Sequence, residues 1–161
     1  MLSIKTDKVL ELTSYTPFSK PSFLQKQKIV DFLHTHLDEF GDPKEDISNC
    51  LDYAMKEVPS QGGFCIVAHN ENKIGGVVIV NQTGMKGYIP ENILVYIAVD
   101  KEQRGKGIGK KLMNAAIEQA EGNIALHVEP ENPAKFLYEK LGFTNKYLEM
   151  RLDKSEASAK S

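Results

Sequence analysis

The chain has 161 residues and a mass of 18.0 kDa, enough for one domain that buries about two-thirds of the surface its unfolded form would expose. Its 20 basic and 22 acidic residues give a formal net charge of −2, which argues against a nucleic-acid backbone as the main partner. No stretch approaches the roughly 20 apolar residues of a membrane span, and Cys50 and Cys65 have neither a metal-ligand nor a redox spacing, so we expect a reduced, cytoplasmic protein without membrane contact.

Two helices are predicted in the first third of the chain, after an optional strand near residues 9–12. Apolar residues recur at helical spacing between residues 21 and 40, and Gly41 ends that pattern. The second helix has a start signal, because Asp42 can cap, Pro43 suits the first helical position and Glu45 stands where a capping-box carboxylate belongs. Its apolar face continues to Val58, and we expect Pro59 to close it.

The period then changes to that of strands. Residues 64–69 and 74–80 are β-branched and apolar runs joined by a polar turn, which predicts a hairpin. Residues 93–99 are apolar almost throughout, so this strand is expected to be covered on both faces and to lie centrally in the sheet.

A glycine-rich segment separates the central strand from an amphipathic helix over residues 108–120. A short strand over 124–128 follows, then a helix that Asn132 caps and Gly142 ends, and a closing strand over 143–152. The strand, helix and strand around the glycines predict a right-handed crossover with a ligand at the carboxyl end of the first strand. We expect one domain over residues 1–152 and a flexible tail over 153–161.

The glycine-rich segment, residues 103–111, reads Gln-Arg-Gly-Lys-Gly-Ile-Gly-Lys-Lys. Glycines allow tight turns and close approach of a ligand, and the first turn of a helix offers unpaired N–H donors and a partial positive charge. The pattern therefore predicts that an anion such as a diphosphate binds here. The cations that could neutralise it are Arg104, Lys106, Lys110 and Lys111.

Two glycine-rich families fit poorly. A Walker loop needs four residues between its glycines and a Ser or Thr after its Lys, whereas here Gly105, Gly107 and Gly109 alternate. A dinucleotide-binding loop would place its third glycine one residue later and stand early in the chain, although Glu129 lies near the expected acidic position, so this alternative is weakened rather than excluded.

The segment resembles the signature of the GNAT superfamily of acyl-CoA N-acyltransferases, which is Gln or Arg, two residues, Gly, one residue, then Gly or Ala. Arg104, Gly107 and Gly109 match this signature. A second block, with Asn132, Tyr138 and Gly142-Phe143, resembles the family's strand, helix and Tyr-x-x-x-Gly-Phe ending. The resemblance implies a mixed α+β fold with a mostly antiparallel sheet, splayed at the cofactor site and flanked by helices.

The resemblance also implies site residues. The diphosphate of CoA would lie on the N–H groups of residues 105–110, and the pantetheine arm would pair with the backbone of Ile97 and Val99, with a bulge freeing the Val99 N–H for the thioester carbonyl. Asn132 would bind the CoA arm, and Tyr138 would be the acid that protonates the departing thiolate. The cofactor-binding residues predicted in this way are Ile97, Val99, Arg104, Gly105, Lys106, Gly107, Ile108, Gly109, Lys110 and Asn132.

The resemblance does not identify the general base, because the central strand lacks the carboxylate that many members of the family carry there. Glu91 is our prediction, and Tyr96, His127 and Glu129 are further candidates. The acidic stretch over residues 38–46 either forms a solvent-exposed face or attracts a cationic amine substrate by its negative charge.

No metal site is predicted, since His34 and His36 point to different faces of a helix and His69 stands alone. We therefore expect an acetyl-CoA-dependent N-acetyltransferase that acts on a small-molecule or peptide amine by direct attack. A non-catalytic acyl-CoA sensor is the alternative. A homodimer is possible, and neither nucleic acid nor membrane is expected as a partner.

Overall fold

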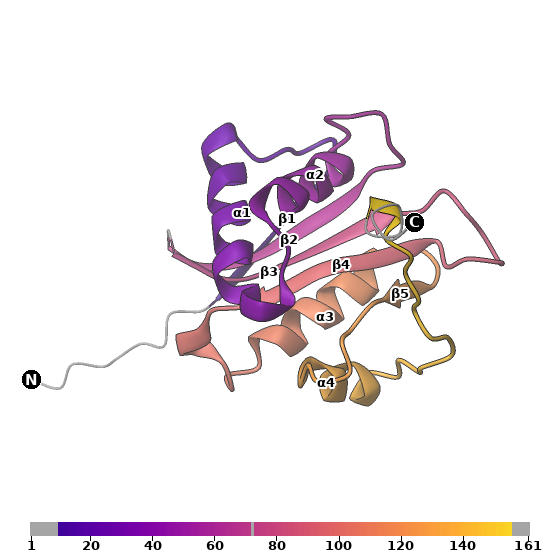
Figure 1. The fold of residues 1–161 in the computed structure, drawn as a ribbon. Helices are drawn as coiled ribbons and strands as arrows, with labels where there is room; N and C mark the ends of the chain where they lie inside the picture. The colour runs from indigo at the N-terminus through magenta and orange to yellow at the C-terminus, as the bar shows by residue number, and fades with distance from the viewer. Residues whose placement is uncertain (1–9, 72, 156–161) are drawn as a thin grey trace, which may run out of the picture. The chain divides into compact units, whose positions relative to one another are not determined.

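The computed structural model describes residues 10–71 and 73–155, so Val9 and residues 156–161 of the expected tail lie outside the described residues. By their internal contacts, the residues up to Leu126 form one compact unit and those from His127 on form a second. The single domain expected over residues 1–152 stays a prediction. The elements, in chain order, are β1 (Glu11–Tyr15), α1 (Phe23–Leu37), the 3-10 helix η1 (Asp38–Phe40), α2 (Lys44–Ala54), β2 (Gly63–Asn70), β3 (Lys73–Gln82), β4 (Asn92–Val99), the 3-10 helix η2 (Lys101–Gln103), α3 (Ile108–Gln119), β5 (Ile124–Leu126) and α4 (Ala134–Lys140) (Figure 1).

The first unit is built on a sheet with the strand order β1-β2-β3-β4-β5. The strands from β1 to β4 pair antiparallel with their neighbours, and β5 pairs parallel with β4. The predicted hairpin is β2 and β3, and β4 lies inside the sheet as expected. The mixed, mostly antiparallel sheet flanked by helices is therefore confirmed.

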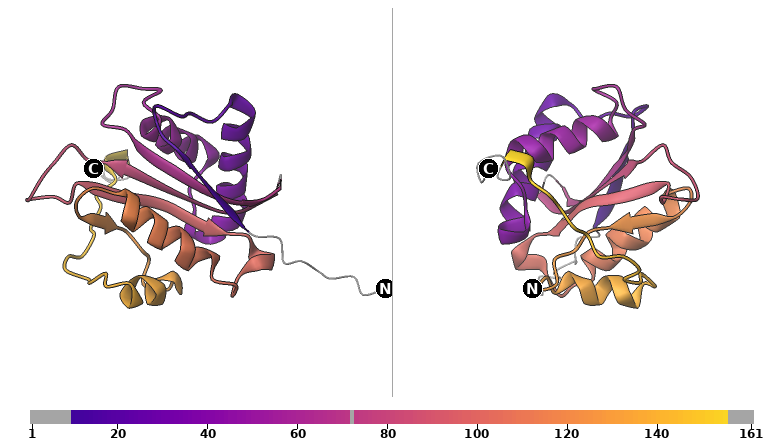
Figure 2. Two further views of the ribbon diagram at one scale, coloured as in Figure 1. Left: turned by 180° about the vertical axis from the view of Figure 1, so that it is seen from behind. Right: turned by 45° about the vertical axis from the view of Figure 1, so that its right-hand side comes forward.

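Helices α1 and α2 cover one face of this sheet and α3 covers the other (Figure 2). The period-2 pattern of the strands sends alternate side chains to the two faces, so each face has an apolar layer to pack against. The core on the α1 and α2 face includes Ile29, Leu33, Ile47, Leu51, Met55, Val67, Val77, Ile79 and Tyr96. The buried side chains of α3 are Ile108, Leu112, Met113 and Ala116.

Gly76 lets the first turns of α3 lie directly on β3. A Cβ at this position would stand 2.7 Å from Leu112 Cδ1 and 3.0 Å from Ile108 Cγ2. Leu112 is fully buried, so it has no free space into which it can move. This close contact fixes the start of α3, and with it the glycine-rich segment, against the sheet.

Replacing Gly76 with alanine is expected to lower the free energy of unfolding by about 1–3 kcal/mol, because the added methyl group overpacks the α3 layer. Urea denaturation measures this value. Gly75→Ala is the matched control, since its Cβ would meet two side-chain ends, Gln103 Oε1 at 3.2 Å and Leu10 Cδ1 at 3.5 Å, and the Ala68 carbonyl at an ordinary contact distance of 3.7 Å. Equal losses in the two variants would contradict the close contact.

The predicted start of α2 is wrong in detail. Pro43, not Asp42, is the N-cap residue, and no side chain caps this helix. The Asp42 carboxylate instead accepts a hydrogen bond from Tyr96, a tertiary partner that takes it away from the helix end. The helix also ends at Ala54 rather than at Pro59, and Val58 is exposed.

The predicted closing strand over residues 143–152 is wrong as well. The structure assigns no strand there, and the large apolar side chains Tyr147, Leu148, Met150 and Leu152 are exposed. A strand needs a partner for its backbone groups, and an apolar pattern does not supply one. The strand expected over 124–128 is likewise shorter, because only residues 124–126 pair with β4.

Candidate active site

The glycine-rich segment presents a row of unpartnered backbone donors. Gly105 and Gly107 have φ angles of 84° and 82°, a left-handed conformation that favours glycine, and Gly107 is the N-cap of α3. No side chain caps α3, and its first backbone bond is donated by Lys111 to the Gly107 carbonyl at 3.1 Å. Within the described residues, the N–H groups of residues 105–110 have no hydrogen-bond partner, so they can bind an anion.

The cations around this segment differ in their contacts. Lys106, Lys110 and Lys111 are exposed, and no ion pair to them is found in residues 10–71 and 73–155. Arg104 instead donates from Nη2 to the His36 carbonyl at 3.0 Å, and so ties the segment to the end of α1. The guanidinium has further donors, so its predicted contact with a phosphate stays a prediction.

The sheet opens beside β4. Residues 92–94 of β4 pair with residues 124–126 of β5, and beyond Leu94 no residue of β5 continues the pairing. In the part of the chain that the structure describes, no strand pairs with the second half of β4 on the side away from β3, and this free edge leads into the glycine-rich segment (Figure 1).

The free edge offers the backbone groups of Ile97 and Val99. The Asp100 N–H donates to the Gly75 carbonyl at 2.9 Å, which makes these two residues a hydrogen-bonded pair across β3 and β4. Bonded and non-bonded pairs alternate along an antiparallel ladder, so the N–H and C=O of Val99 and of Ile97 point away from β3. An extended ligand can pair with this edge as an added strand.

A β-bulge lies at the point where the sheet opens. Val80 pairs with Leu94 and Ile79 pairs with Tyr96, so Val95 is the extra residue of β4. The bulge is several residues earlier than the strand end at which we expected it. It turns Tyr96 toward the α1 and α2 face, where Tyr96 joins the core, although Leu94 two residues earlier pairs with Val80 on the α3 face.

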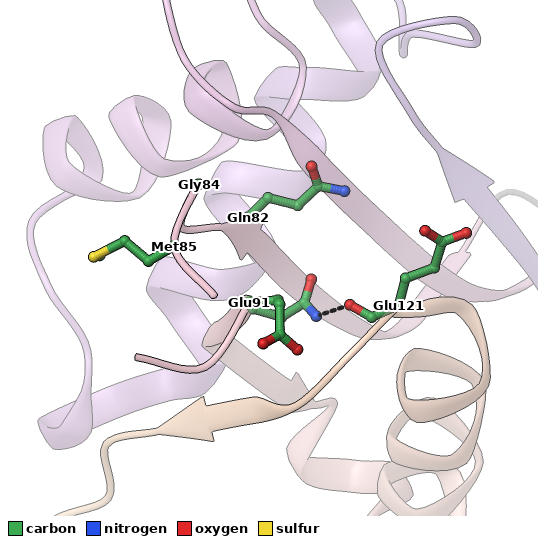
Figure 3. A pocket seen from close by; sticks show the side chains of 6 residues that line it. Gln82, Gly84, Met85, Glu91 and Glu121 are labelled. Atoms are coloured by element: carbon green, nitrogen blue, oxygen red, sulfur yellow. Dashed lines mark hydrogen bonds between the residues drawn. The ribbon is translucent and has the colours of Figure 1, made fainter. Parts of the chain in front are cut away.

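Glu91 lies at the other end of β4. Its carboxylate accepts a hydrogen bond from the Asn123 N–H at 2.6 Å, and thereby holds the turn between α3 and β5. With Gln82, Met85 and Glu121 it lines a small open pocket, across which Asn92 donates to the Glu121 carbonyl at 2.7 Å (Figure 3). At about 3.3 Å per residue, Glu91 is roughly 13 Å along the chain from Val95, so this position does not favour its predicted role as general base, which stays a prediction.

The second unit holds Asn132 and Tyr138. Asn132 Oδ1 accepts from the Ala134 N–H at 2.9 Å, but the N-cap residue of α4 is Pro133 and no side chain caps this helix, so the predicted Asn132 cap is wrong in detail. Tyr138 is buried, with 7% of its surface exposed, and burial raises its pKa to about 12. The phenol therefore carries its proton at neutral pH, as a general acid must.

The Gly-Phe pair after Tyr138 ends α4 in a Schellman motif. The Phe143 N–H donates to the Tyr138 carbonyl at 3.0 Å and the Gly142 N–H to the Glu139 carbonyl at 3.1 Å. Gly142 has the left-handed φ of 100° that this motif requires, and the rings of Tyr138 and Phe143 lie 6.1 Å apart. The motif thus fixes the backbone of the predicted acid.

The two further candidates for the general base in this unit, His127 and Glu129, have other contacts. His127 Nδ1 lies 3.5 Å from Arg151 Nη2, and the Glu129 carbonyl accepts from the Asn132 N–H at 2.9 Å.

The described residues also bear on the expectation of no metal site. In the part of the chain that the structure describes, no group of three or more His, Cys, Asp or Glu side chains is arranged to hold a metal. No helix among residues 10–71 and 73–155 has the length and apolarity to cross a membrane.

The two cysteines are not bonded to each other and have high pKa values. Burial is the main cause, and it raises the pKa of the Cys50 thiol to about 12 and that of Cys65 further above its usual range. Thiols of this kind are protonated at neutral pH and therefore poor nucleophiles. This agrees with a mechanism without a cysteine intermediate.

A helix start with donors free to bind an anion lies beside an opened strand edge that can pair with an extended ligand, and comparison with known proteins identifies the family. A sequence model of the family described as "Acetyltransferase (GNAT) domain" matches residues 61–145. The chain belongs to this GNAT acetyltransferase family and is an N-acetyltransferase.

Individual relatives agree. The chain is 31% identical over 102 residues to a 5-NmdU N-acetyltransferase of Pseudomonas phage PaMx11, a match that covers 62% of this chain and 70% of the relative. It is 33% identical over 85 residues to N-alpha-acetyltransferase 30 of Schizosaccharomyces pombe (strain 972 / ATCC 24843), covering 50% of this chain and 57% of that protein. An aminoglycoside N-acetyltransferase solved in complex with CoA has a similar fold, with a TM-score of 0.64 and 13% identity over 91% of this chain and 97% of the other.

Proposed function

We propose that the protein transfers an acetyl group from acetyl-CoA to a primary amine by direct attack of the amine nitrogen. The observation that carries this proposal is that the N–H groups of residues 105–110 have no hydrogen-bond partner among residues 10–71 and 73–155, and that this segment follows the free edge of β4 after the short helix η2. The amides and Lys106 and Lys110 would bind the diphosphate, and Ile97 and Val99 would pair with the pantetheine arm. Asn132 and Tyr138 are proposed to bind the CoA arm and to protonate the departing thiolate.

The residues present fit this co-substrate. A diphosphate needs several convergent donors and positive charge, and the segment supplies both without a competing side-chain cap. Pantetheine needs only main-chain partners, and the β4 edge supplies them. That one of the similar folds was solved with CoA supports the choice of nucleotide.

Calorimetry and thiol release test the proposal together. We expect CoA to bind with a measurable heat, and acetyl-CoA to release free thiol faster when the correct primary amine is present. A panel of peptides with free N-termini, Nα-blocked lysine and aminoglycosides samples the acceptors that differ in amine pKa. Binding of CoA with no thiol release from any amine would favour the sensor alternative, and absence of binding would contradict the proposed site.

A further inference from the structure

The phenol of Tyr96 and the carboxylate of Asp42 form a hydrogen bond between distant parts of the chain. Tyr96 Oη donates to Asp42 Oδ2 at 2.5 Å, although 54 residues separate the two. Tyr96 is 8% exposed and its ring belongs to the core, whereas Asp42 is exposed on the segment before α2. A buried strand side chain thus holds a carboxylate above β4.

This pair stands at the opening of the sheet. Tyr96 follows the bulge residue Val95, and its neighbour Ile97 is the first residue whose backbone groups face the free edge. The Tyr96 side chain points to the α1 and α2 face, while Ile97, which pairs with Val78, belongs to the face that α3 covers. An acyl group held along the free edge would therefore lie beside the strand position of Tyr96, whose side chain extends to the α2 side of the sheet.

The state of this phenol limits what it can do. Burial is the first cause that raises the pKa of Tyr96 well above its usual value, and the hydrogen bond and charge of Asp42 add to it. A free phenolate is therefore not available as a base at neutral pH. The Oη proton is committed to Asp42, and no other group in the described part of the chain bonds this hydroxyl, so its remaining lone pair can accept a proton from a ligand.

We propose that Tyr96 and Asp42 form a proton relay that takes the proton from the acceptor amine. This inference rests on the proposed function and adds its missing base. As the C–N bond forms and the C–S bond breaks, the proton leaving nitrogen passes to Tyr96 Oη and the Tyr96 proton passes to Asp42 Oδ2. The thiolate leaves with the electron pair of the C–S bond and takes a separate proton from the general acid.

The relay needs no unusually basic carboxylate. The nitrogen of the amine becomes strongly acidic as it turns into an amide nitrogen, so an ordinary carboxylate can accept its proton at that stage. Asp42 thereby supplies, from the segment before α2, the carboxylate that the sequence of β4 lacks.

Two isosteric variants and a matched control test the relay. Asp42→Asn keeps an oxygen that can accept from Tyr96 but removes the basic carboxylate, and Tyr96→Phe removes the hydroxyl but keeps the ring in the core. Asp46→Asn is the control, because Asp46 also acts on Tyr96 through its charge but makes no hydrogen bond with it. All three proteins are assayed for CoA affinity, thermal unfolding and amine-dependent thiol release.

We expect Asp42→Asn and Tyr96→Phe to lower kcat by about 100-fold or more at pH 7, with CoA affinity unchanged and Asp46→Asn within about threefold of wild type. The double variant should be no worse than the slower single variant, because both changes break one relay. Hydroxide can take the proton from the reacting nitrogen in place of the relay, so the deficit of Asp42→Asn should shrink as the pH rises, which a merely structural role would not produce. Besides Asp42, the titratable groups that act on Tyr96 are Asp46 and Cys50, and the Cys50 thiol is protonated throughout this range.

Different failures have different readouts. If Asp42→Asn and Tyr96→Phe turn over like Asp46→Asn while the wild-type protein is active, the relay is wrong and the proposed function stands. If the wild-type protein binds CoA but releases no thiol with any amine, the proposed function fails and the relay fails with it.

Discussion

The Tyr138→Phe variant is expected to release CoA about 100- to 10,000-fold more slowly than the wild-type protein, at saturating acetyl-CoA and amine. Phenylalanine keeps the ring, and the Schellman motif that holds this residue uses only its backbone carbonyl and the ring contact with Phe143. The affinity for CoA and the thermal stability should therefore change little. Stopped-flow or steady-state thiol release gives kcat, and calorimetry gives the dissociation constant.

The raised pKa of Tyr138 determines both the free-energy cost of protonating the thiolate and the pH dependence of that proton transfer. A phenol with a pKa of about 12 protonates a thiolate with a pKa of about 8.5 at a cost of roughly 5 kcal/mol, unless the departing thiolate is also kept from water and becomes more basic. Because the acid form persists until the pH approaches 12, loss of the Tyr138 proton should cause no fall in kcat between pH 6 and 9. A fall in that range must come from another group.

Tyr147→Phe is the matched control for the acid. Tyr147 lies in the same unit, is 79% exposed, and has Lys146 above its ring rather than a buried site around its hydroxyl. The Tyr147→Phe variant should retain wild-type turnover. Equal turnover in Tyr138→Phe and Tyr147→Phe would remove Tyr138 from its proposed role.

Placing a negative charge at the start of α3 is expected to weaken CoA binding by at least about tenfold. Gly107→Asp and Gly107→Asn form the pair for this test, because both side chains tolerate the left-handed conformation that Gly107 adopts better than other non-glycine residues do. They have nearly the same shape and differ in charge. The Asp variant should repel the diphosphate, and the Asn variant measures the cost of the side chain alone.

Salt dependence distinguishes repulsion from damage to the loop. The difference in affinity between the Asp and Asn variants should decrease as the ionic strength rises from about 0.05 to 1 M, because the charges are exposed and screened. Acidic side chains at a helix start stabilise the helix, so the Asp variant should not unfold earlier than the Asn variant. Identical affinities for CoA in the two variants would place the diphosphate elsewhere.

Local sequence signals predicted the parts of the fold whose causes are local. The β-branched and apolar runs joined by a polar turn predicted β2 and β3. The apolar run over residues 93–99 predicted a central β4, and the glycines at 105 and 107 predicted a turn that opens a helix. Each of these patterns reflects a backbone geometry over a few residues. The family resemblance also pointed to Gly142-Phe143. In the structure these two residues end α4 through backbone hydrogen bonds, which is a local role.

Features that depend on a distant partner could not be predicted in this way. Asp42 looked like a helix cap, and only the fold brings Tyr96 to it across 54 residues. The bulge at Val95 depends on the register between β3 and β4, which no pattern within β4 encodes. The stretch 143–152 has the composition of a strand, but strand formation requires a paired edge as well as suitable side chains.

The burial of Cys50 and Cys65 has a practical consequence for enzymology. Colorimetric thiol reagents react with the thiolate form of cysteine. Neither side chain forms a thiolate appreciably near neutral pH. The folded enzyme should thus contribute almost no background signal, and every equivalent of colour can be counted as one turnover. Slow appearance of two further equivalents per chain would report unfolding in the same cuvette.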